Sequence, residues 1–505
     1  MRHNLAFCAL LAGALLLPSM APAAPEVERF AREVAESELA ASATPGLSIA
    51  VIADDRVTAL AVGEADREAG IPASVETVYP AASVSKLLTA VLVMRQVERG
   101  ALELDQPANA YLPEPRWIRD ADGEPVAATL RQLLSHTSGL PVAFIRAGAE
   151  EGQAALSLDE YLADGLVTRR PPGEKIIYSN EGFALLGYLA AQAEGEDFHA
   201  HVQRVLLDPL GMPESSFRVL PDVAVATGYG GPPFDDGSEP STHTDITAIA
   251  PAGSLRTTVL DLGRFARMLL RGGELDGARI LQPATLAEMW RLQARPHPEL
   301  PQGFGLGFGV LERPGRKLVW WDGDLPGAAS RLALLPDAGV GLVMLSNRSD
   351  HTPLNAISEQ LFSALAGPAE PDVYTPDVAA ASSIPGGYRM SDVLDPVLWF
   401  FEPFLVVAVE QREDGFFIGF FGEFFELRPA GPGTYRITGG IFDGLLARFD
   451  GDQAVIGWFL AERVGFWDST VALAVYGGVL VLSLLAALGY AIVRLLRRVR
   501  APRPA

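Results

Sequence analysis

A serine and a lysine that could form a nucleophile with its base stand three positions apart, at Ser83 and Lys86. The stretch from Ser83 to Arg99 predicts one helix that ends at Gly100, and it is apolar on nearly every side, so it should be buried. Positions i and i+3 share a helix face, which places the Lys86 amine beside the Ser83 hydroxyl. Because burial disfavours an ammonium ion, Lys86 can accept a proton from Ser83 and activate it as a nucleophile.

The lysine content of the chain adds weight to this pair. The sequence has only three lysines, Lys86, Lys175 and Lys317, against 37 arginines. Arginine cannot lose its proton in a protein. A rare lysine in a nearly uncharged helix therefore indicates a position that needs a titratable amine. The alternative is a lysine whose head group reaches out to solvent along the helix.

A second group of polar residues is Tyr178-Ser179-Asn180, which lies between a Pro-Pro-Gly-Glu-Lys loop and an apolar helix. A phenol next to an ammonium can ionise more readily and relay a proton, so Tyr178 is a candidate catalytic residue. The Asn180 amide is a candidate to hold a substrate carbonyl or the lysine. Taken alone, Tyr178 is more typical of a structural residue in a turn.

A third group is Trp321-Asp322-Gly323, followed by Asp324 and a Pro-Gly turn. A strand edge at this point could present backbone N–H groups to an oxyanion that develops on a substrate. Trp321, Gly323 and Asp324 are therefore candidate substrate-binding residues. By itself, the motif is also typical of an ordinary turn.

The elements that must position these residues fall into two regions. From about residue 43 to 367, strands at both ends enclose helices, which predicts an α+β domain. We expect strands at Gly46–Ala53, Val57–Gly63, Gly305–Glu312, Ser330–Leu335 and Val340–Leu345, and helices at Leu158–Leu166, Glu181–Glu194, Leu260–Arg271 and Pro283–Leu292. After a linker at 368–385, short apolar runs separated by turn residues predict a small all-β barrel or sandwich at 386–467.

The second region is rich in phenylalanine, with 13 of the 24 phenylalanines between Phe400 and Phe466. A compact aromatic core explains this enrichment. Docking on a membrane surface is the alternative, since aromatic side chains favour membrane interfaces.

Together, the three groups resemble the serine β-lactamase and penicillin-binding-protein superfamily, in the branch of class C β-lactamases, D-aminopeptidases and carboxylesterases. Supporting segments are Leu133–Leu140, Tyr178–Phe183, Asp208–Met212, Pro251–Leu255 and Leu325–Gly327, and the likeness covers nearly all of 43–367. The resemblance implies an antiparallel sheet flanked by helices, with a helical subdomain. It also implies that Ser83 is the acylated nucleophile, Lys86 its base, Tyr178 the proton shuttle and Asn180 a substrate-orienting amide. The oxyanion hole would use the N–H groups of Ser83 and Asp324.

One departure from the family pattern bears on the substrate. Relatives carry Lys-Thr-Gly or His-x-Gly where this chain has Trp321-Asp322-Gly323, so the cation that grips a substrate carboxylate is missing. We expect Asp322 to repel such a carboxylate, which favours an uncharged acyl substrate over a β-lactam or a carboxypeptidase substrate. Trp-x-Gly also resembles some related esterases. A catalytically inactive scaffold that binds cell-envelope material is the alternative function.

The two ends of the chain predict export and anchoring. Arg2 precedes an apolar run of 13 residues and a small-residue cleavage site near Ala23, which indicates a signal peptide at 1–23. Residues 470–493 carry no charge and are long enough for a transmembrane helix. Five arginines lie in the tail at 494–505, which the positive-inside rule keeps in the cytoplasm. The expected location is a bacterial cell membrane, with a single span and the catalytic domain on the periplasmic or extracellular side.

The net charge and the motifs of the chain limit the kinds of partner that it can bind. The formal charge of −22 repels nucleic-acid phosphates, so no nucleic acid is expected. The glycine-rich segment Gly303–Gly309 suits a closely packed strand rather than a dinucleotide loop, so no cofactor is expected. His199 and His201 are assigned to a solvated helix face and not to a metal, and His136 to a structural hydrogen bond. The expected partners are a small acyl or peptide substrate, possibly derived from the cell envelope, and the membrane.

Overall fold

The computed structural model describes residues 24–143, 147, 156–219, 223–231, 237–241, 246–313, 315–370, 374, 383–392, 405–420 and 423–465. The predicted signal peptide (1–23), transmembrane helix (470–493) and basic tail (494–505) lie outside these residues. Within the described ranges, no helix combines the length and the apolar character of a membrane span.

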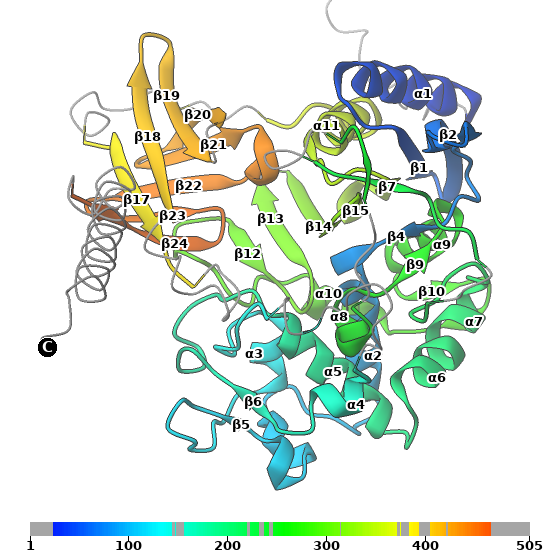
Figure 1. Ribbon diagram of the computed structural model, residues 1–505, viewed down its shortest axis with the longest axis vertical. Coiled ribbons are helices and arrows are strands. Elements are labelled where there is room, and N and C mark those ends of the chain that lie inside the picture. Colours follow the sequence, from blue (N-terminus) through cyan, green and yellow to red (C-terminus); the bar gives the residue numbers. More distant parts are fainter. Residues whose placement is uncertain are drawn as a thin grey trace, which may run out of the picture.

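A single antiparallel sheet forms the centre of the first region (Figure 1). Its strand order is β12-β13-β14-β15-β16-β1-β2-β3. The strands are β1 (Gly46–Ala53), β2 (Arg56–Asp66), β3 (Ile71–Pro72), β12 (Gln302–Phe304), β13 (Gly309–Arg313), β14 (Arg316–Leu325), β15 (Ala328–Leu335) and β16 (Val340–Ser346). Leu47 of β1 lies opposite Ser346 of β16, so the pairing joins the two ends of this region, as the α+β prediction requires.

Helices cover both faces of the sheet. On one face lie α1 (Ala24–Ala41) and α11 (Thr352–Ala366), whose apolar residues pack on Trp320 and Met344. The other face packs against the helical part of the molecule, shown in blue, cyan and green in Figure 1. Its helices are α2 (Ser85–Glu98), α3 (Leu130–Leu134), α4 (Leu158–Tyr161), α5 (Asn180–Gln192), α6 (Phe198–Val202), α7 (Asp208–Leu210), α8 (Ala250–Gly253), α9 (Val259–Leu270) and α10 (Pro283–Met289).

Two-residue strands tie the loops of this helical part together. They pair as β4 (Tyr79–Pro80) with β9 (Arg256–Thr257), β5 (Ile118–Arg119) with β6 (Leu166–Val167), β7 (Gly228–Tyr229) with β8 (Pro240–Ser241), and β10 (Glu274–Leu275) with β11 (Ala278–Arg279). The pairing of β4 with β9 lies two residues before the turn that carries Ser83 and therefore helps to fix its position.

The second region is a closed barrel of eight antiparallel strands. The strands are β17 (Gly386–Met390), β18 (Val406–Arg412), β19 (Gly415–Phe420), β20 (Glu423–Gly431), β21 (Thr434–Thr438), β22 (Leu446–Asp450), β23 (Gln453–Ile456) and β24 (Phe459–Val464). Pairing of β17 with β24 closes it, so the barrel and not the sandwich is correct. Ile418, Ile437 and Ile456 are fully buried, as expected where eight strands enclose just enough space for side chains.

Two predicted elements are wrong. The helix expected at Leu158–Leu166 stops after α4 at Tyr161, because Gly165 turns the chain with a φ of +78° into the short strand β6. The strand expected at Gly305–Glu312 begins only at Gly309, as β13, because residues 305–308 form the turn that joins it to β12. In that turn Gly307 has a φ of +86°, and a Cβ there would lie 2.3 Å from the Cβ of Ala90 in α2. The alternating glycines therefore serve close packing of a turn against a helix.

Candidate active site

Ser83 lies in a strained turn at the start of α2. The turn is a 3-10 helix over Ala82–Val84, and Ala82 has a φ of +46°, which is unfavourable for a residue with a side chain. Neighbouring groups hold it: the Ser330 hydroxyl donates to the Ala81 carbonyl at 2.7 Å, and the Ser85 hydroxyl donates to the Ala82 carbonyl at 2.6 Å. The predicted helix is confirmed, except that its first turn is 3-10.

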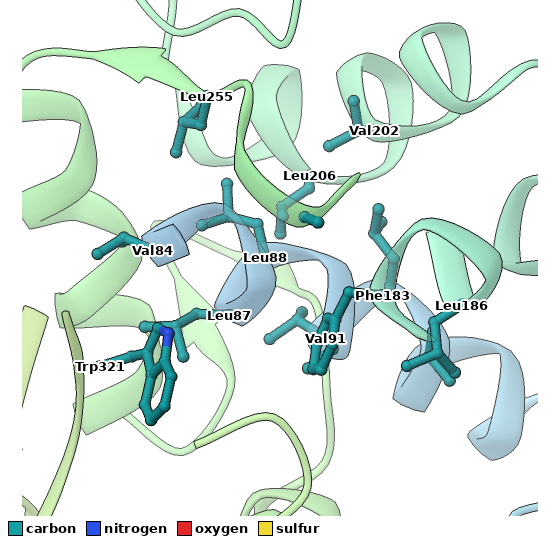
Figure 2. Close-up of a cluster of buried hydrophobic side chains, with 14 of the residues drawn as sticks. Val84, Leu87, Leu88, Val91, Phe183, Leu186, Val202, Leu206, Leu255 and Trp321 are labelled. Atoms are coloured by element: carbon teal, nitrogen blue, oxygen red, sulfur yellow. The ribbon is translucent and has the colours of Figure 1, made fainter. Parts of the chain in front are cut away.

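Lys86 is almost completely buried, with 1% of its surface exposed. Its Nζ lies 3.1 Å from Ser83 Oγ and donates to the carbonyl of Ala252 at 2.6 Å. Figure 2 shows the apolar packing around α2, in which Val91 lies beside Phe183 of α5 and Leu87 lies beside Trp321. Burial holds the pKa of Lys86 well below its usual value, so the amine is available as a proton acceptor.

Tyr178 completes the hydrogen bonding of Ser83. Its hydroxyl donates to Ser83 Oγ at 2.7 Å, and its ring centroid lies 4.9 Å from Lys86 Nζ. Burial raises the pKa of Tyr178 above its usual value, and the hydrogen bond to Ser83 offsets only part of that rise. The pKa of Tyr178 therefore shifts opposite to the expectation that this phenol ionises more readily, because burial dominates.

The segment that carries Tyr178 is fixed by the N-terminus of α5. The Ser179 hydroxyl accepts a hydrogen bond from Gly182 N at 2.9 Å, which caps the helix. The Ser179 N–H donates to Nδ1 of His136 at 3.1 Å, so His136 has the structural role predicted for it. Burial keeps the pKa of His136 well below its usual value. Asn180 is the first residue of α5 and is 7% exposed, and its side-chain amide has no hydrogen bond to a described residue.

The third motif is part of strand β14 and not a turn. β14 pairs with β13 only as far as Trp320, so residues 321–325 have a free edge. A Cβ on Gly323 would lie 2.9 Å from Ser83 N and 2.4 Å from the Ala81 carbonyl oxygen, so only glycine fits against the nucleophile turn. Trp321 is 6% exposed, and its ring stacks on Tyr178 at 5.7 Å. Ser83, Lys86, Tyr178, Trp321 and Gly323 thus come together.

The two carboxylates of this strand point away from the site. Alternation along a strand puts Asp322 and Asp324 on the face opposite Trp321. Asp322 accepts two hydrogen bonds from Arg331, both at 2.6 Å, and although burial alone would raise its pKa, Arg331 lowers it. Asp324 accepts from the Ser349 hydroxyl at 2.5 Å. The expectation that Asp322 repels a substrate carboxylate is therefore wrong, and only the backbone of Asp324 remains a candidate for the oxyanion hole.

Two aromatic residues that line the site were not predicted from the sequence. Phe304 lies 5.2 Å from Trp321 and 4.7 Å from His136, between ring centroids. Trp458, from the turn between β23 and β24 of the barrel, lies 5.4 Å from Phe304 and 5.6 Å from Trp321. No local motif marks Trp458, because its role depends on how the barrel packs against the first region.

The histidines of α6 are not on a solvated face, which corrects the prediction for them. His201 is fully buried, with Nδ1 3.1 Å from Glu196 and Nε2 3.4 Å from the Gln96 amide of α2. His199 is half-buried, and burial lowers its pKa to about 4. Both histidines therefore belong to the packing between α6 and its neighbours.

Comparison with known proteins places this geometry in a family. The family model described as Beta-lactamase matches residues 31–364. Penicillin-binding protein 4 from Amycolatopsis lactamdurans is 31% identical over 345 residues, which cover 66% of this chain and 88% of that protein. Esterase EstB from Burkholderia gladioli is 31% identical over 283 residues, 50% of this chain and 70% of that protein.

Solved structures resemble the chain over a longer stretch. The octameric penicillin-binding protein homologue from Pyrococcus abyssi aligns with a TM-score of 0.56 at 23% identity, covering 87% of this chain and 99% of that one. This likeness concerns the fold. The family match extends over most of the chain, and it includes the Ser83, Tyr178 and Trp321 segments. The chain belongs to the beta-lactamase family of serine hydrolases.

Proposed function

We propose that the protein is an exported, membrane-anchored acyl hydrolase that cleaves uncharged esters or amides through an acyl-enzyme on Ser83. The observation that carries the proposal is that Ser83 Oγ lies between a group suited to accept a proton and a group suited to donate one. Lys86 Nζ is 3.1 Å away with a lowered pKa, and the Tyr178 hydroxyl is 2.7 Å away with a raised pKa. The first shift favours the neutral amine and the second favours the protonated phenol, so one group is suited to accept a proton and the other to donate one.

Acylation then follows from these proton positions. Ser83 Oγ attacks the substrate carbonyl while its proton passes to the neutral amine of Lys86. The negative charge on the carbonyl oxygen is stabilised by the N–H of Ser83 and, at the free edge of β14, by the N–H of Asp324. Tyr178 gives its proton to the leaving oxygen or nitrogen and regains one from Lys86, so the proton taken from Ser83 ends on the leaving group.

Deacylation reverses the order of these transfers. A water molecule attacks the ester of Ser83, its proton passes through Tyr178 and Lys86, and Ser83 Oγ leaves with a proton. Each step returns both groups to the uncharged state. A buried, uncharged pair suits this reaction because no ion has to be held in the apolar interior between turnovers.

The walls of the site favour a substrate without a carboxylate. Trp321 occupies the position where relatives place a cation, and the rings around it are those of Phe304, Trp458 and the neutral His136. The guanidinium of Arg331 on β15 is paired with Asp322 on the opposite face of the sheet. The described residues of this wall offer a carboxylate no counter-ion to replace the hydration that it would lose.

Export and anchoring rest on the sequence alone. The apolar run near the N-terminus, the uncharged segment 470–493 and the arginines that follow it support a single span with the enzyme outside the cytoplasm. Separating membranes from soluble fractions of cells that express the full chain, with and without residues 470–505, tests this part. Recovery of the full chain in the soluble fraction would contradict it.

Labelling with a fluorophosphonate probe tests the enzyme assignment. The wild type should react at one serine, Ser83→Ala should not react, and Lys86→Met should react about 10²- to 10⁴-fold more slowly. Lys317→Met is the matched control, since Lys317 is a partly exposed lysine paired with Glu312 at 3.3 Å. An unlabelled wild type would support the inactive scaffold instead.

A substrate panel then separates the chemical classes. Neutral short-chain esters should be hydrolysed faster than a chromogenic cephalosporin and than peptides that end in D-Ala-D-Ala, both of which carry a carboxylate. Turnover of the cephalosporin or the peptide well above the esters would contradict the inference drawn from Trp321.

A further inference from the structure

The turn between β23 and β24 brings a barrel residue to the edge of the candidate active site. Gly457 and Trp458 form this turn, and Trp458 packs on the two largest apolar clusters among the described residues, which lie on the two sides of the sheet. Its ring centroid is 5.6 Å from Trp321, with 31° between the planes, and 5.4 Å from Phe304. Trp458 itself remains partly exposed, whereas Trp321 beneath it is nearly buried.

A buried glutamine fixes this turn to the first region. Gln302, 1% exposed, donates from Nε2 to the carbonyls of Leu446 at 2.9 Å and Gly457 at 2.7 Å. Its Oε1 accepts from Leu446 N at 2.8 Å. The residue immediately before Trp458 is therefore held by strand β12 of the catalytic region, so the position of the indole is set by the structure and not by a loose contact.

Stacked rings connect Trp458 to the proton donor of the proposed reaction. Trp458 contacts Trp321, Trp321 stacks on Tyr178 at 5.7 Å, and the Tyr178 hydroxyl donates to Ser83 Oγ at 2.7 Å. Since Tyr178 protonates the leaving atom, the leaving group must depart on this side of Ser83. The substituent on that leaving atom is thus directed toward the Trp321–Trp458 pair.

We infer that Trp458 is a specificity-determining residue that selects substrates with an uncharged, apolar or aromatic leaving group. The inference rests on the proposed function, and it assigns to the barrel a part of the substrate site. The flat face of an indole favours a planar apolar group by stacking and by burial of apolar surface. The surrounding rings offer a charged leaving group no counter-ion.

Esters with one acyl group and different leaving groups test the inference. Phenyl acetate and 2-naphthyl acetate share the acetyl-enzyme and have leaving groups of similar acidity, so their kcat/KM ratio reports on binding of the leaving group. Trp458→Ala should lower the 2-naphthyl to phenyl preference about tenfold, and Trp458→Phe should retain most of it. The preference among p-nitrophenyl acetate, butyrate and hexanoate should keep its order, because acyl chains lie on the other side of Ser83.

The controls separate specificity from folding. Phe420→Ala removes another ring of the barrel, which packs on Phe442 at 5.0 Å and on Phe425 at 6.3 Å, and should leave the naphthyl preference unchanged. Thermal unfolding of each variant shows whether it is folded. A folded Trp458→Ala variant with an unchanged naphthyl preference, or with equal changes in both ester series, would overturn the inference.

A binding measurement distinguishes this inference from the proposed function. In Ser83→Ala, which cannot be acylated, calorimetric titration with 2-naphthyl acetate should show binding that weakens about tenfold when Trp458→Ala is added. An inactive, unlabelled wild type would refute the proposed hydrolase, yet this titration would still decide whether Trp458 binds the aromatic group. Equal affinity in the single and double variants would overturn the role of Trp458 even in an active enzyme.

Discussion

Lys86 differs from the other two lysines of the chain in its surroundings. Lys175 pairs with Asp392, and Lys317 pairs with Glu312, whereas the ion pairs found among the described residues do not include Lys86. Lys86 is instead enclosed by α2, α5 and α8 and bonded to Ser83 and the Ala252 carbonyl. An isolated ammonium in these surroundings is unfavourable, so the fold itself creates the base.

This placement should cost stability at neutral pH. The unfolded chain keeps Lys86 protonated up to its ordinary pKa of 10.5, while burial lowers the pKa in the folded state. Between these two pKa values the unfolded state binds more protons, so stability rises with pH. Lys86→Met should therefore raise the free energy of unfolding at pH 7, with a gain that shrinks toward pH 10 in urea titrations. Lys317→Met should show no such gain, and a loss of stability in Lys86→Met at both pH values would contradict the argument.

The pH dependence of catalysis should show one rising limb. Acylation requires the neutral amine, so kcat/KM for a neutral ester increases as pH rises through the lowered pKa of Lys86. The raised pKa of Tyr178 keeps the phenol protonated, so the rate should then stay level through pH 9. His136 adds no inflection near neutrality, because its pKa is well below the usual value. A falling limb between pH 7 and 9 in the rate profile would show that one of these assignments is wrong.

At the scale of elements, the nucleophile turn and strand β14 form one unit. Gly323 allows the strand to lie against the backbone of Ala81 and Ser83, and Ser330 on β15 bonds the Ala81 carbonyl. The sheet therefore supports the left-handed Ala82 that aims Ser83. The free edge of β14 beyond Trp320 is what leaves room for a substrate carbonyl oxygen next to Ser83 N.

A single methyl group at this contact should disable the site. In Gly323→Ala the new Cβ would meet the Ala81 carbonyl at 2.4 Å and Ser83 N at 2.9 Å, both backbone atoms that cannot move aside alone. We expect a loss of stability of about 1–3 kcal/mol and at least a 10²-fold slower reaction with the fluorophosphonate probe. Gly465→Ala is the control, since no atom of the described residues lies within 4 Å of a Cβ there. Normal labelling of Gly323→Ala would contradict the contact.

The sequence predicted the long elements of the first region and the site residues on them. The periodic spacing of hydrophobic residues predicted β1, β15, β16, α5 and α9. The rarity of lysine in the chain indicated Lys86 as a site residue. The directions in which the side chains point were harder to predict from the sequence. Whether Asp322 faces the substrate or Arg331 depends on the face of β14, which was not recognised as a strand. The state of Tyr178 depended on the competition between burial and a nearby charge, and only the packed structure decides that competition.

At the scale of the whole molecule, the barrel is joined to the segment that carries Tyr178. Asp392, between β17 and β18, is buried and forms ion pairs with Lys175, with Arg170 at 3.3 Å and with Arg169 at 3.8 Å. These cations lie on the loop that leads directly into Tyr178. Together with Trp458 and Gln302, they make the barrel a second support for the site (Figure 1). A contact of this kind, between residues 217 positions apart along the chain, leaves no local pattern in the sequence.

Loss of this ion pair should affect both stability and the site. Asp392→Asn leaves Lys175 without its carboxylate in a largely buried position, which should cost about 2 kcal/mol in the free energy of unfolding and slow the reaction of Ser83 with the probe. Glu410→Gln is the matched control on the barrel, where the exposed pair with Arg412 should be worth less than about 1 kcal/mol. Equal, small effects of both variants in urea unfolding would show that the barrel does not support the Tyr178 loop.

Direct titration of Lys86 is the most decisive measurement for the whole account. With only three lysines in the chain, a protein labelled with carbon-13 at the lysine ε position gives three NMR signals, and Lys86→Met assigns one of them. The account predicts that this signal titrates far below the ordinary lysine pKa of 10.5 and reports an uncharged amine at pH 7. A Lys86 signal that remains that of an ammonium ion until about pH 10 would contradict it.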